Sequence, residues 1–128
     1  MSRIVEQSPH FSKQELQCPC CGQSKMDLDF IDKLEQLRAA FNAPMRLSSA
    51  YRCPAHNEQV SHTGKRGPHT TGKAVDVLVS GQNAHRLLTL ALELGFTGIG
   101  ISQKGEHGKR FVHLDMLEGQ TRPWVWSY

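Results

Sequence analysis

The sequence of 128 residues contains no apolar run long enough to cross a membrane, since a spanning helix needs about 20 such residues. Residues 1–11 include Arg3, Glu6 and His10 and hold no apolar stretch of the length that a signal peptide has. These absences predict a protein that has no transmembrane segment and is cytoplasmic at synthesis. A function outside the membrane would then depend on export or release by another component.

The sequence also lacks internal repeats, a linker rich in Pro, Gly or Ser, and any run of charges of one sign. Hydrophobic residues make up 38% and charged residues 21%, which excludes a disordered or fibrous chain. We therefore expect a single domain over residues 1–128. The formal net charge of +3 is only weak evidence for an anionic partner, and we predict no nucleic-acid partner.

Helical and strand patterns are mixed along the chain. Apolar spacing and a Ser-x-x-Glu capping box predict helices at residues 11–16, 28–41 and 82–94. Short strands are expected at residues 45–49, 74–79, 98–101 and 111–117. Residues 61–71, which are rich in Gly, Thr and His, are expected to form a loop. The predicted fold class is α+β.

A carboxylate interrupts one of the predicted buried strands. Asp76 lies within the run Ala-Val-Asp-Val-Leu-Val, where an ionised group without a partner costs several kcal/mol. It must therefore be neutralised, pair with a cation or bind a metal. His69 lies seven residues earlier, across a Thr-Thr-Gly turn, so that loop and strand can converge.

A second pair of polar side chains lies in the stretch Phe111-Val-His-Leu-Asp-Met116. His113 and Asp115 occupy alternate positions and share one face of the predicted strand. His69, Asp76 and His113 supply the nitrogen and oxygen ligands that Zn²⁺ prefers, and three protein ligands leave a fourth position open for water. Such a zinc site activates water for attack on a carbonyl. We therefore predict a catalytic zinc site formed by these three residues.

Each of these residues also has an ordinary structural interpretation. His113 alone could be a core histidine, and Asp76 alone could pair with one of the 15 basic residues. The combination favours the metal site. Of the remaining histidines, we expect surface positions for His10 and His85. His56, His62 and His107 could lie on the surface, orient a metal ligand or contact the substrate.

Four stretches follow one another along the chain: Ser49-Ala-Tyr-Arg-Cys-Pro-Ala-His-Asn57, Pro68-His-Thr-Thr-Gly-Lys-Ala-Val-Asp76, Gly98-Ile-Gly100 and Phe111-Val-His-Leu-Asp115. In this order they resemble the motifs of the zinc D-Ala-D-Ala carboxypeptidase family, which also contains phage L-alanyl-D-glutamate endopeptidases and related murein peptidases. The similarity extends over residues 11–126, which is nearly the whole chain.

The resemblance implies an α+β fold in which a small antiparallel sheet, flanked by helices, carries Zn²⁺ on one face, held by the same three ligands. It implies zinc-dependent hydrolysis of a peptide bond in bacterial peptidoglycan, of either the carboxypeptidase or the endopeptidase type. Arg52 would bind a carboxylate or carbonyl oxygen of the substrate and stabilise the oxyanion, with Tyr51 and His107 as further substrate-binding residues. Without a signal peptide, such an enzyme would reach the cell wall after release, as phage lysis enzymes do.

The chain departs from the family pattern at two positions. Gly67 stands where the family usually has Ser or Thr, and Arg110 stands where many members place a catalytic acid or base. Arginine cannot act as a base at neutral pH. Asp115 is then the first candidate for the general base, ahead of His107 and Glu106, and orientation of a metal ligand is its alternative role.

Arg110 also keeps a second class of function open, in which the chain is a catalytically weak or inactive zinc-binding module of a phage or a cell envelope. A zinc-ribbon nucleic-acid binder is disfavoured, because the chain lacks a second Cys pair and a basic stripe with aromatic residues.

Three interpretations remain for the cysteines Cys18, Cys20, Cys21 and Cys53. They could be free thiols, form disulfides (two of them, or one from Cys18 or Cys20 to Cys53), or bind a structural zinc ion. Disulfides are disfavoured in a chain without a signal peptide. The spacing departs from the paired Cys-x-x-Cys of zinc ribbons, and adjacent cysteines rarely ligate one metal, so zinc binding here is only weakly indicated.

Overall fold

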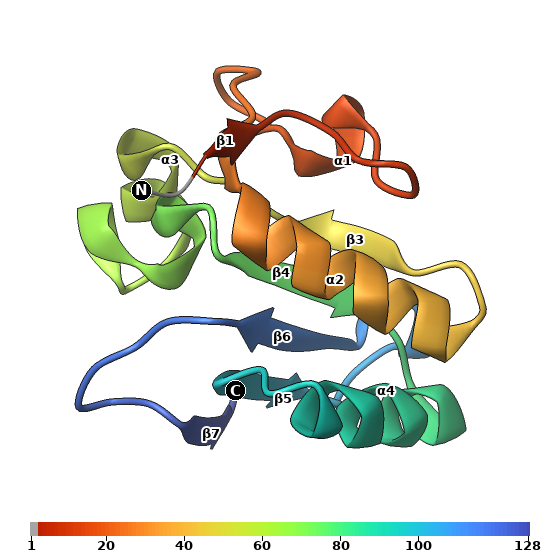
Figure 1. Ribbon diagram of the computed structural model, residues 1–128. Coiled ribbons are helices and arrows are strands. Elements are labelled where there is room, and N and C mark those ends of the chain that lie inside the picture. Colours follow the sequence, from red (N-terminus) through yellow and green to blue (C-terminus); the bar gives the residue numbers. More distant parts are fainter. Residues whose placement is uncertain (1–2) are drawn as a thin grey trace.

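A five-stranded sheet in the order β3-β4-β6-β5-β7 forms the centre of the molecule (Figure 1). Its strands are β3 (Arg46–Ser49), β4 (Ala74–Leu78), β5 (Gly98–Ser102), β6 (Phe111–Asp115) and β7 (Trp124–Ser127). The structure is a computed structural model that describes residues 3–128. Residues 1 and 2, which begin the segment expected to contain no signal peptide, lie outside this range.

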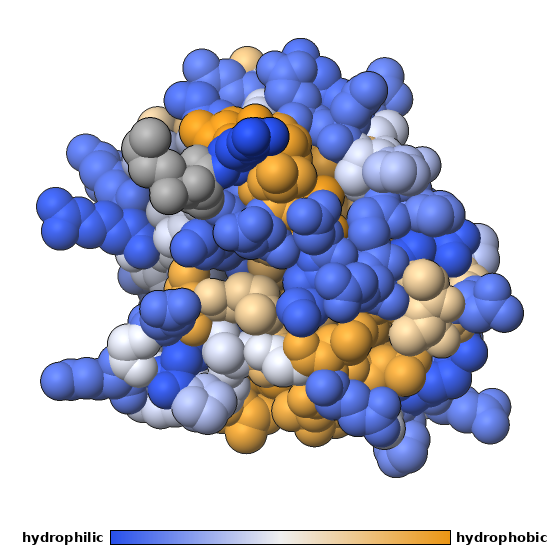
Figure 2. All heavy atoms as spheres, in the orientation of Figure 1, coloured by the Kyte–Doolittle hydropathy of each residue, from blue (hydrophilic) through white to orange (hydrophobic). Residues whose placement is uncertain are grey.

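The two long helices, α2 (Leu28–Phe41) and α4 (Gly81–Glu93), cover one face of the sheet (Figure 1). Helix α2 has Asp27 as its N-cap, and the Asp27 carboxylate accepts a hydrogen bond from the backbone N–H of Phe30 at 3.0 Å, which satisfies a free donor of the first turn. It ends at Asn42, which adopts a left-handed conformation. In the same orientation, hydrophobic residues reach the surface where the two helices adjoin, and hydrophilic residues surround them (Figure 2).

The core lies between these helices and the sheet. Leu34 and Leu37 from α2, Leu87 from α4, and Val75 and Leu114 from the sheet are fully buried and belong to one apolar cluster. Because side chains alternate along a strand, the residues next to Val75 and Leu114 on their strands point to the opposite face. That face is therefore available for a polar site.

The remaining elements are short and flank the sheet. They are β1 (Ile4–Val5), α1 (Lys13–Leu16), β2 (Met26–Asp27), α3 (Pro54–Val60) and the 3-10 turns Gly64–Arg66, Pro68–Thr71 and His107–Lys109. The expected capping box is present at α1, where Ser12 and Glu15 bond to each other's backbone. Among the described residues, no helix combines the length and apolar character that a membrane span requires.

The α+β prediction is confirmed, with two corrections. The expected antiparallel sheet is a mixed one, because β7 joins the edge of β5 in parallel. Residues 61–71 contain two 3-10 turns instead of an irregular loop throughout, and a helix that the sequence analysis missed, α3, comes just before them. The sequence pattern around α3 is too short for a helical period, and the start of this helix depends on Cys53 as its N-cap and Pro54 in its first turn.

Candidate metal centre

Three polar side chains meet on the face of the sheet that the helices leave free. Asp76 on β4 and His113 on β6 are direct cross-strand partners, and His69 comes from the 3-10 turn Pro68–Thr71 just before β4. Asp76 Oδ1 lies 3.2 Å from His69 Nε2 and 3.0 Å from His113 Nδ1. All three residues are buried, and their ligand atoms lie within 4.8 Å of one another. We call these three residues the His–Asp–His cluster.

Hydrogen bonds orient both imidazole rings of the cluster. His69 Nδ1 donates to the carbonyl oxygen of Ala50 at 2.7 Å, because a carbonyl can only accept. His113 Nε2 lies 2.8 Å from Asp115 Oδ2 and donates to that carboxylate. In each ring the other nitrogen lies against Asp76 Oδ1, and once it gives up its proton it offers a lone pair that a metal ion can take. Two imidazole nitrogens and one carboxylate oxygen, each fixed by an outer partner, are a donor set that fits Zn²⁺.

Asp76 remains ionised in this site. Burial by itself would raise the pKa of its carboxyl group, but hydrogen bonds and charge from His113 and His69 outweigh this effect and hold the pKa well below its usual range. The same carboxylate also lies 3.6 Å from the guanidinium nitrogen Nη2 of Arg52. Several partners thus offset the desolvation free energy of the buried Asp76 charge.

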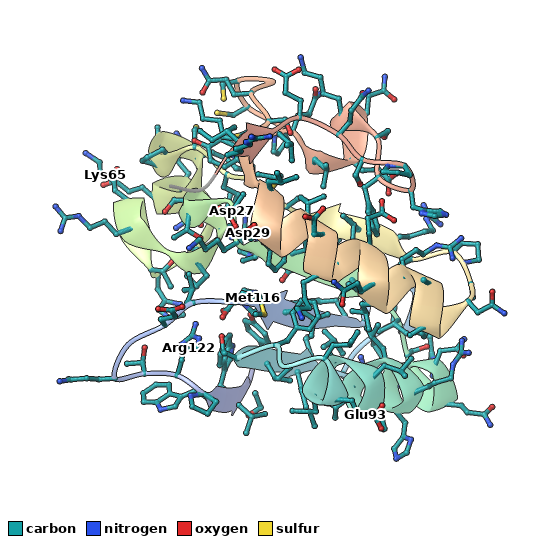
Figure 3. The ribbon with its side chains drawn as sticks, in the orientation of Figure 1. Asp27, Asp29, Lys65, Glu93, Met116 and Arg122 are labelled. Carbon is teal, nitrogen blue, oxygen red and sulfur yellow. The ribbon has the colours of Figure 1, made fainter. Side chains whose placement is uncertain are left out.

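Asp115 lies behind His113 and is fully buried. Arg122, on the segment between β6 and β7 (Figure 3), binds it with two nearly parallel bonds, Nε to Oδ1 at 2.9 Å and Nη2 to Oδ2 at 2.8 Å. The backbone N–H of Leu117 donates to Oδ1 at 3.2 Å. Burial acts to raise the pKa of Asp115, but His113 and Arg122 bring it down to about 2. Oδ2 thus holds the His113 ring, and the bonds from Arg122 and Leu117 fix the orientation of the carboxylate.

The family model for peptidase M15 matches residues 9–115 of the chain, a span that includes the whole His–Asp–His cluster. The chain belongs to the peptidase M15 family. This is a family of zinc metallopeptidases. Membership supports the prediction that the chain is a peptidase and that its substrate is a peptide. A search of curated proteins gave no match to this M15 chain.

Arg52 lies beside the cluster of the M15 chain and is held from two sides. Its Nε donates to Ser49 Oγ at 3.0 Å and its Nη1 donates to Asn57 Oδ1 at 3.1 Å. The backbone N–H of Arg52 also donates to the carbonyl of His69 at 3.0 Å. These bonds direct the remaining edge of the guanidinium towards Asp76.

Asn57 is a site residue that the sequence analysis did not single out. Its side chain is fully buried, and its amide nitrogen donates to Thr63 Oγ1 at 2.9 Å and to the carbonyl of Gly64. The only indication in the sequence was its position at the end of the Tyr-Arg stretch. Gly67, the first departure from the family pattern, is explained by the same contacts. A Cβ atom there would meet the Asn57 amide and the Thr63 hydroxyl, so Thr63 occupies the space of the missing side chain.

The two glycines of the Gly98-Ile-Gly100 motif make room on the cluster face. Each is a cross-strand partner of a site residue, Gly98 of Asp115 and Gly100 of His113. A Cβ atom at Gly98 would collide with the Asp115 carboxylate, and one at Gly100 would lie 2.6 Å from the indole nitrogen of Trp126. The Trp126 ring instead packs against the His113 ring, with 5.1 Å between the ring centroids, and covers that side of the cluster.

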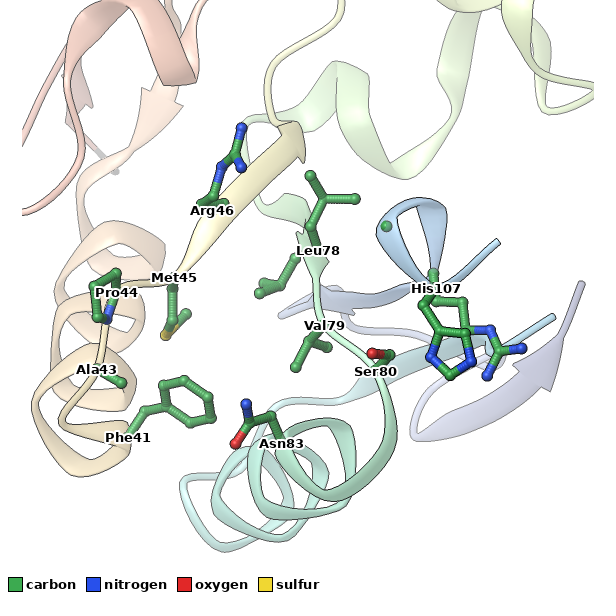
Figure 4. A pocket seen from close by; sticks show the side chains of 13 residues that line it. Phe41, Ala43, Pro44, Met45, Arg46, Leu78, Val79, Ser80, Asn83 and His107 are labelled. Atoms are coloured by element: carbon green, nitrogen blue, oxygen red, sulfur yellow. The ribbon is translucent and has the colours of Figure 1, made fainter. Parts of the chain in front are cut away.

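The structure does not bring the other two expected substrate-binding side chains to the cluster. Tyr51 is 5% exposed and packs in the apolar core. His107 is exposed and lines a pocket of about 460 Å³ beside Leu78 and Ser80 (Figure 4), and no cluster residue lines that pocket. Arg110 donates from Nε and Nη2 to the carbonyl of Gly105 at 3.1 and 3.0 Å, so its side chain is bound to its own loop.

Replacement of Arg122 by alanine is expected to weaken zinc binding by the His–Asp–His cluster. Asp115 would lose both guanidinium bonds and hold the His113 ring less firmly, and changes of such outer partners typically cost about 10- to 100-fold in metal affinity. Competition with a chromophoric chelator measures the affinity. Arg110→Ala removes an arginine outside the cluster and is the control. Equal affinity in the two variants would contradict a role for Arg122.

Proposed function

We propose that the chain is a zinc peptidase that hydrolyses a peptide bond in the stem or cross-link peptides of bacterial peptidoglycan. His69, Asp76 and His113 would hold the zinc ion. The observation that carries the proposal is the convergence of two oriented imidazole nitrogens on one ionised carboxylate oxygen, in a chain of a zinc metallopeptidase family.

When bound, Zn²⁺ supplies the Lewis acidity that lets water attack an amide carbonyl at neutral pH. The protein contributes fixed ligands. Ala50 sets the tautomer of His69 through its carbonyl, and Asp115 does the same for His113 while Arg122 holds Asp115 in place. Preorganised ligands of this kind need no rearrangement during the reaction.

Arg52 would contact the substrate directly. Ser49 and Asn57 fix its guanidinium, and its side chain is 18% exposed next to Asp76. A fixed fork of donors suits the oxygen of the scissile carbonyl, on which negative charge develops, and also suits a terminal carboxylate. The first role would increase turnover, whereas the second would increase substrate affinity.

Asp115 receives the orienting role in this proposal, the second of the two roles expected for it. A general base must reach the proton that it abstracts. Asp115 is fully buried. Its Oδ1 accepts hydrogen bonds from Arg122 and Leu117, and its Oδ2 accepts them from Arg122 and His113. Its substitution should therefore affect activity through the position of the His113 ring.

The alternative function is a zinc-binding module with weak or no turnover. It is favoured by a specific observation: the carboxylate beside the cluster, Asp115, is fully buried and bonded to Arg122, and the Arg110 side chain is bound to its own loop. Such a module would bind peptidoglycan peptides without cleaving them.

Digestion of purified peptidoglycan separates the two functions. For an enzyme we expect soluble products that disappear with a chelator and return with added zinc, and mass spectrometry of these products identifies the bond. Released D-Ala indicates a carboxypeptidase, whereas a new D-Glu amino terminus indicates an L-Ala-D-Glu endopeptidase. Co-sedimentation with peptidoglycan and no products, in protein with full metal content, would favour the binding module.

A further inference from the structure

A second group of metal-ligating side chains lies outside the His–Asp–His cluster. Cys18, Cys20 and Cys21 follow α1 in one tight turn, and Cys53 is the N-cap of α3. The four sulfur atoms lie within 4.8 Å of one another, and all four residues are free cysteines. The fold thus gathers into one group every cysteine that the sequence contains.

Backbone N–H groups surround these sulfurs. The N–H of Cys53 donates to Cys18 Sγ at 3.3 Å, and the N–H of His56 donates to Cys53 Sγ at 3.5 Å. Such donors stabilise a thiolate, which is the form that binds metals. Four thiolates so close together without a cation would repel one another.

The turn that carries three of the sulfurs has a defined shape. The N–H of Cys18 donates to the carbonyl of Gln23 at 2.7 Å, and the N–H of Gly22 donates to the carbonyl of Cys18 at 2.8 Å. Gly22 has a φ of 72°, which glycine adopts at little cost. The turn thereby brings Cys18 and Cys21 together at the Cys-x-x-Cys spacing of zinc sites, with Cys20 on the same side.

We propose that Cys18, Cys20, Cys21 and Cys53 bind a second Zn²⁺ ion in a closed, structural site. Four sulfurs around zinc at tetrahedral angles stand about 3.8 Å apart, given Zn–S bonds of about 2.3 Å. The separations in the protein, 3.4 Å between Cys20 and Cys53 and at most 4.8 Å within the group, lie around this value. A single disulfide would use two sulfurs and leave the other two unexplained.

The metal would tie the N-terminal segment to the His–Asp–His cluster. Helix α1 has only four residues and β1 and β2 have two each, so little regular secondary structure stabilises this segment, which packs on the core through Phe11, Leu16 and Met26. Cys53 directly follows Arg52 and caps the helix that carries Asn57, the residue that holds the Arg52 guanidinium. The site would thus stabilise the fold and fix the backbone from which Arg52 extends.

Zinc content of the reduced protein tests this site. We expect two zinc ions per wild-type chain, one in the double variant Cys20→Ser/Cys21→Ser, and one in His113→Ala. Gln23→Ala, an exposed position in the same turn, is the control and should keep two. One zinc in the wild type that persists in the double variant would overturn the proposal, and so would a mass two hydrogens lower under non-reducing conditions, because it indicates a disulfide.

Cobalt substitution gives a readout that does not need the cysteine variant to fold. Co²⁺ bound by thiolates shows an intense sulfur-to-metal charge-transfer band, which a site of two histidines and an aspartate lacks. We expect this band in the wild type and, undiminished, in His113→Ala. Its absence from Co²⁺-loaded wild-type protein would overturn the thiolate site. Because peptidase activity enters neither measurement, a failure of the proposed function would leave this result unaffected.

Discussion

A His113→Ala protein is expected to bind no zinc at the His–Asp–His cluster and to release no products from peptidoglycan. The substitution removes one of the two imidazole nitrogens that face Asp76 and leaves a two-ligand site, in which zinc is held weakly and is not positioned for catalysis. It also removes the group that Asp115 orients. His69→Ala should have the same effect, because its nitrogen faces the same oxygen of Asp76.

Metal analysis after dialysis, together with the peptidoglycan assay, measures this effect. His85→Ala is a matched control, since His85 is exposed on α4, on the helix-covered side of the sheet. Because His113 is buried, circular dichroism and thermal unfolding of the metal-free proteins establish that the variant has folded. A folded His113→Ala protein with an undiminished zinc content would remove the proposed site.

The sequence was sufficient to predict the core of the cluster because the chemistry of a buried charge is local. Asp76 within an apolar run indicates a partner wherever the strand packs. The period of two indicates that His113 and Asp115 share a face. The register that makes Asp76 and His113 direct partners depends on pairing between strands more than 30 positions apart in the sequence. No local pattern specifies it, and the two residues were grouped by their ligand chemistry and by the resemblance to a family.

Partners that come from distant segments were not predictable in the same way. Arg122 lies beyond the last predicted strand, and it approaches Asp115 because β7 turns back to pair with β5. A buried Asp115 needs a cationic partner for the same reason as Asp76. No spacing rule, however, identifies which basic residue is that partner. The cysteine group is a similar case, since Cys53 joins the turn of Cys18 through contacts that local patterns do not encode.

The position of Tyr51 shows a different limit. Tyr51 and Arg52 are neighbours in one motif, and Arg52 lies at the cluster. Adjacent residues in an extended segment, however, point in opposite directions. The fold turns Arg52 towards Asp76 and Tyr51 into the core. A motif therefore indicates which segment forms a site, while the backbone decides which of its side chains enter it.

Arg52→Lys is expected to retain the zinc ion and to lower turnover by about 10²- to 10³-fold, the typical cost of losing one donor to a developing oxyanion. Lysine keeps the positive charge. However, its single ammonium group cannot bond Ser49 and Asn57 and still present a fixed donor next to Asp76, as the guanidinium does. Arg46→Lys, at an exposed position on β3, is the matched control.

The kinetic constants of Arg52→Lys distinguish the two roles of Arg52. A lower kcat at an unchanged KM means that the arginine acts on the oxyanion of the transition state, whereas a higher KM at an unchanged kcat means that it binds a carboxylate of the substrate in the ground state. Wild-type values for both constants would exclude either contact. A loss of zinc would instead mean that Arg52 acts through Asp76, because its Nη2 lies 3.6 Å from the carboxylate that faces both histidines.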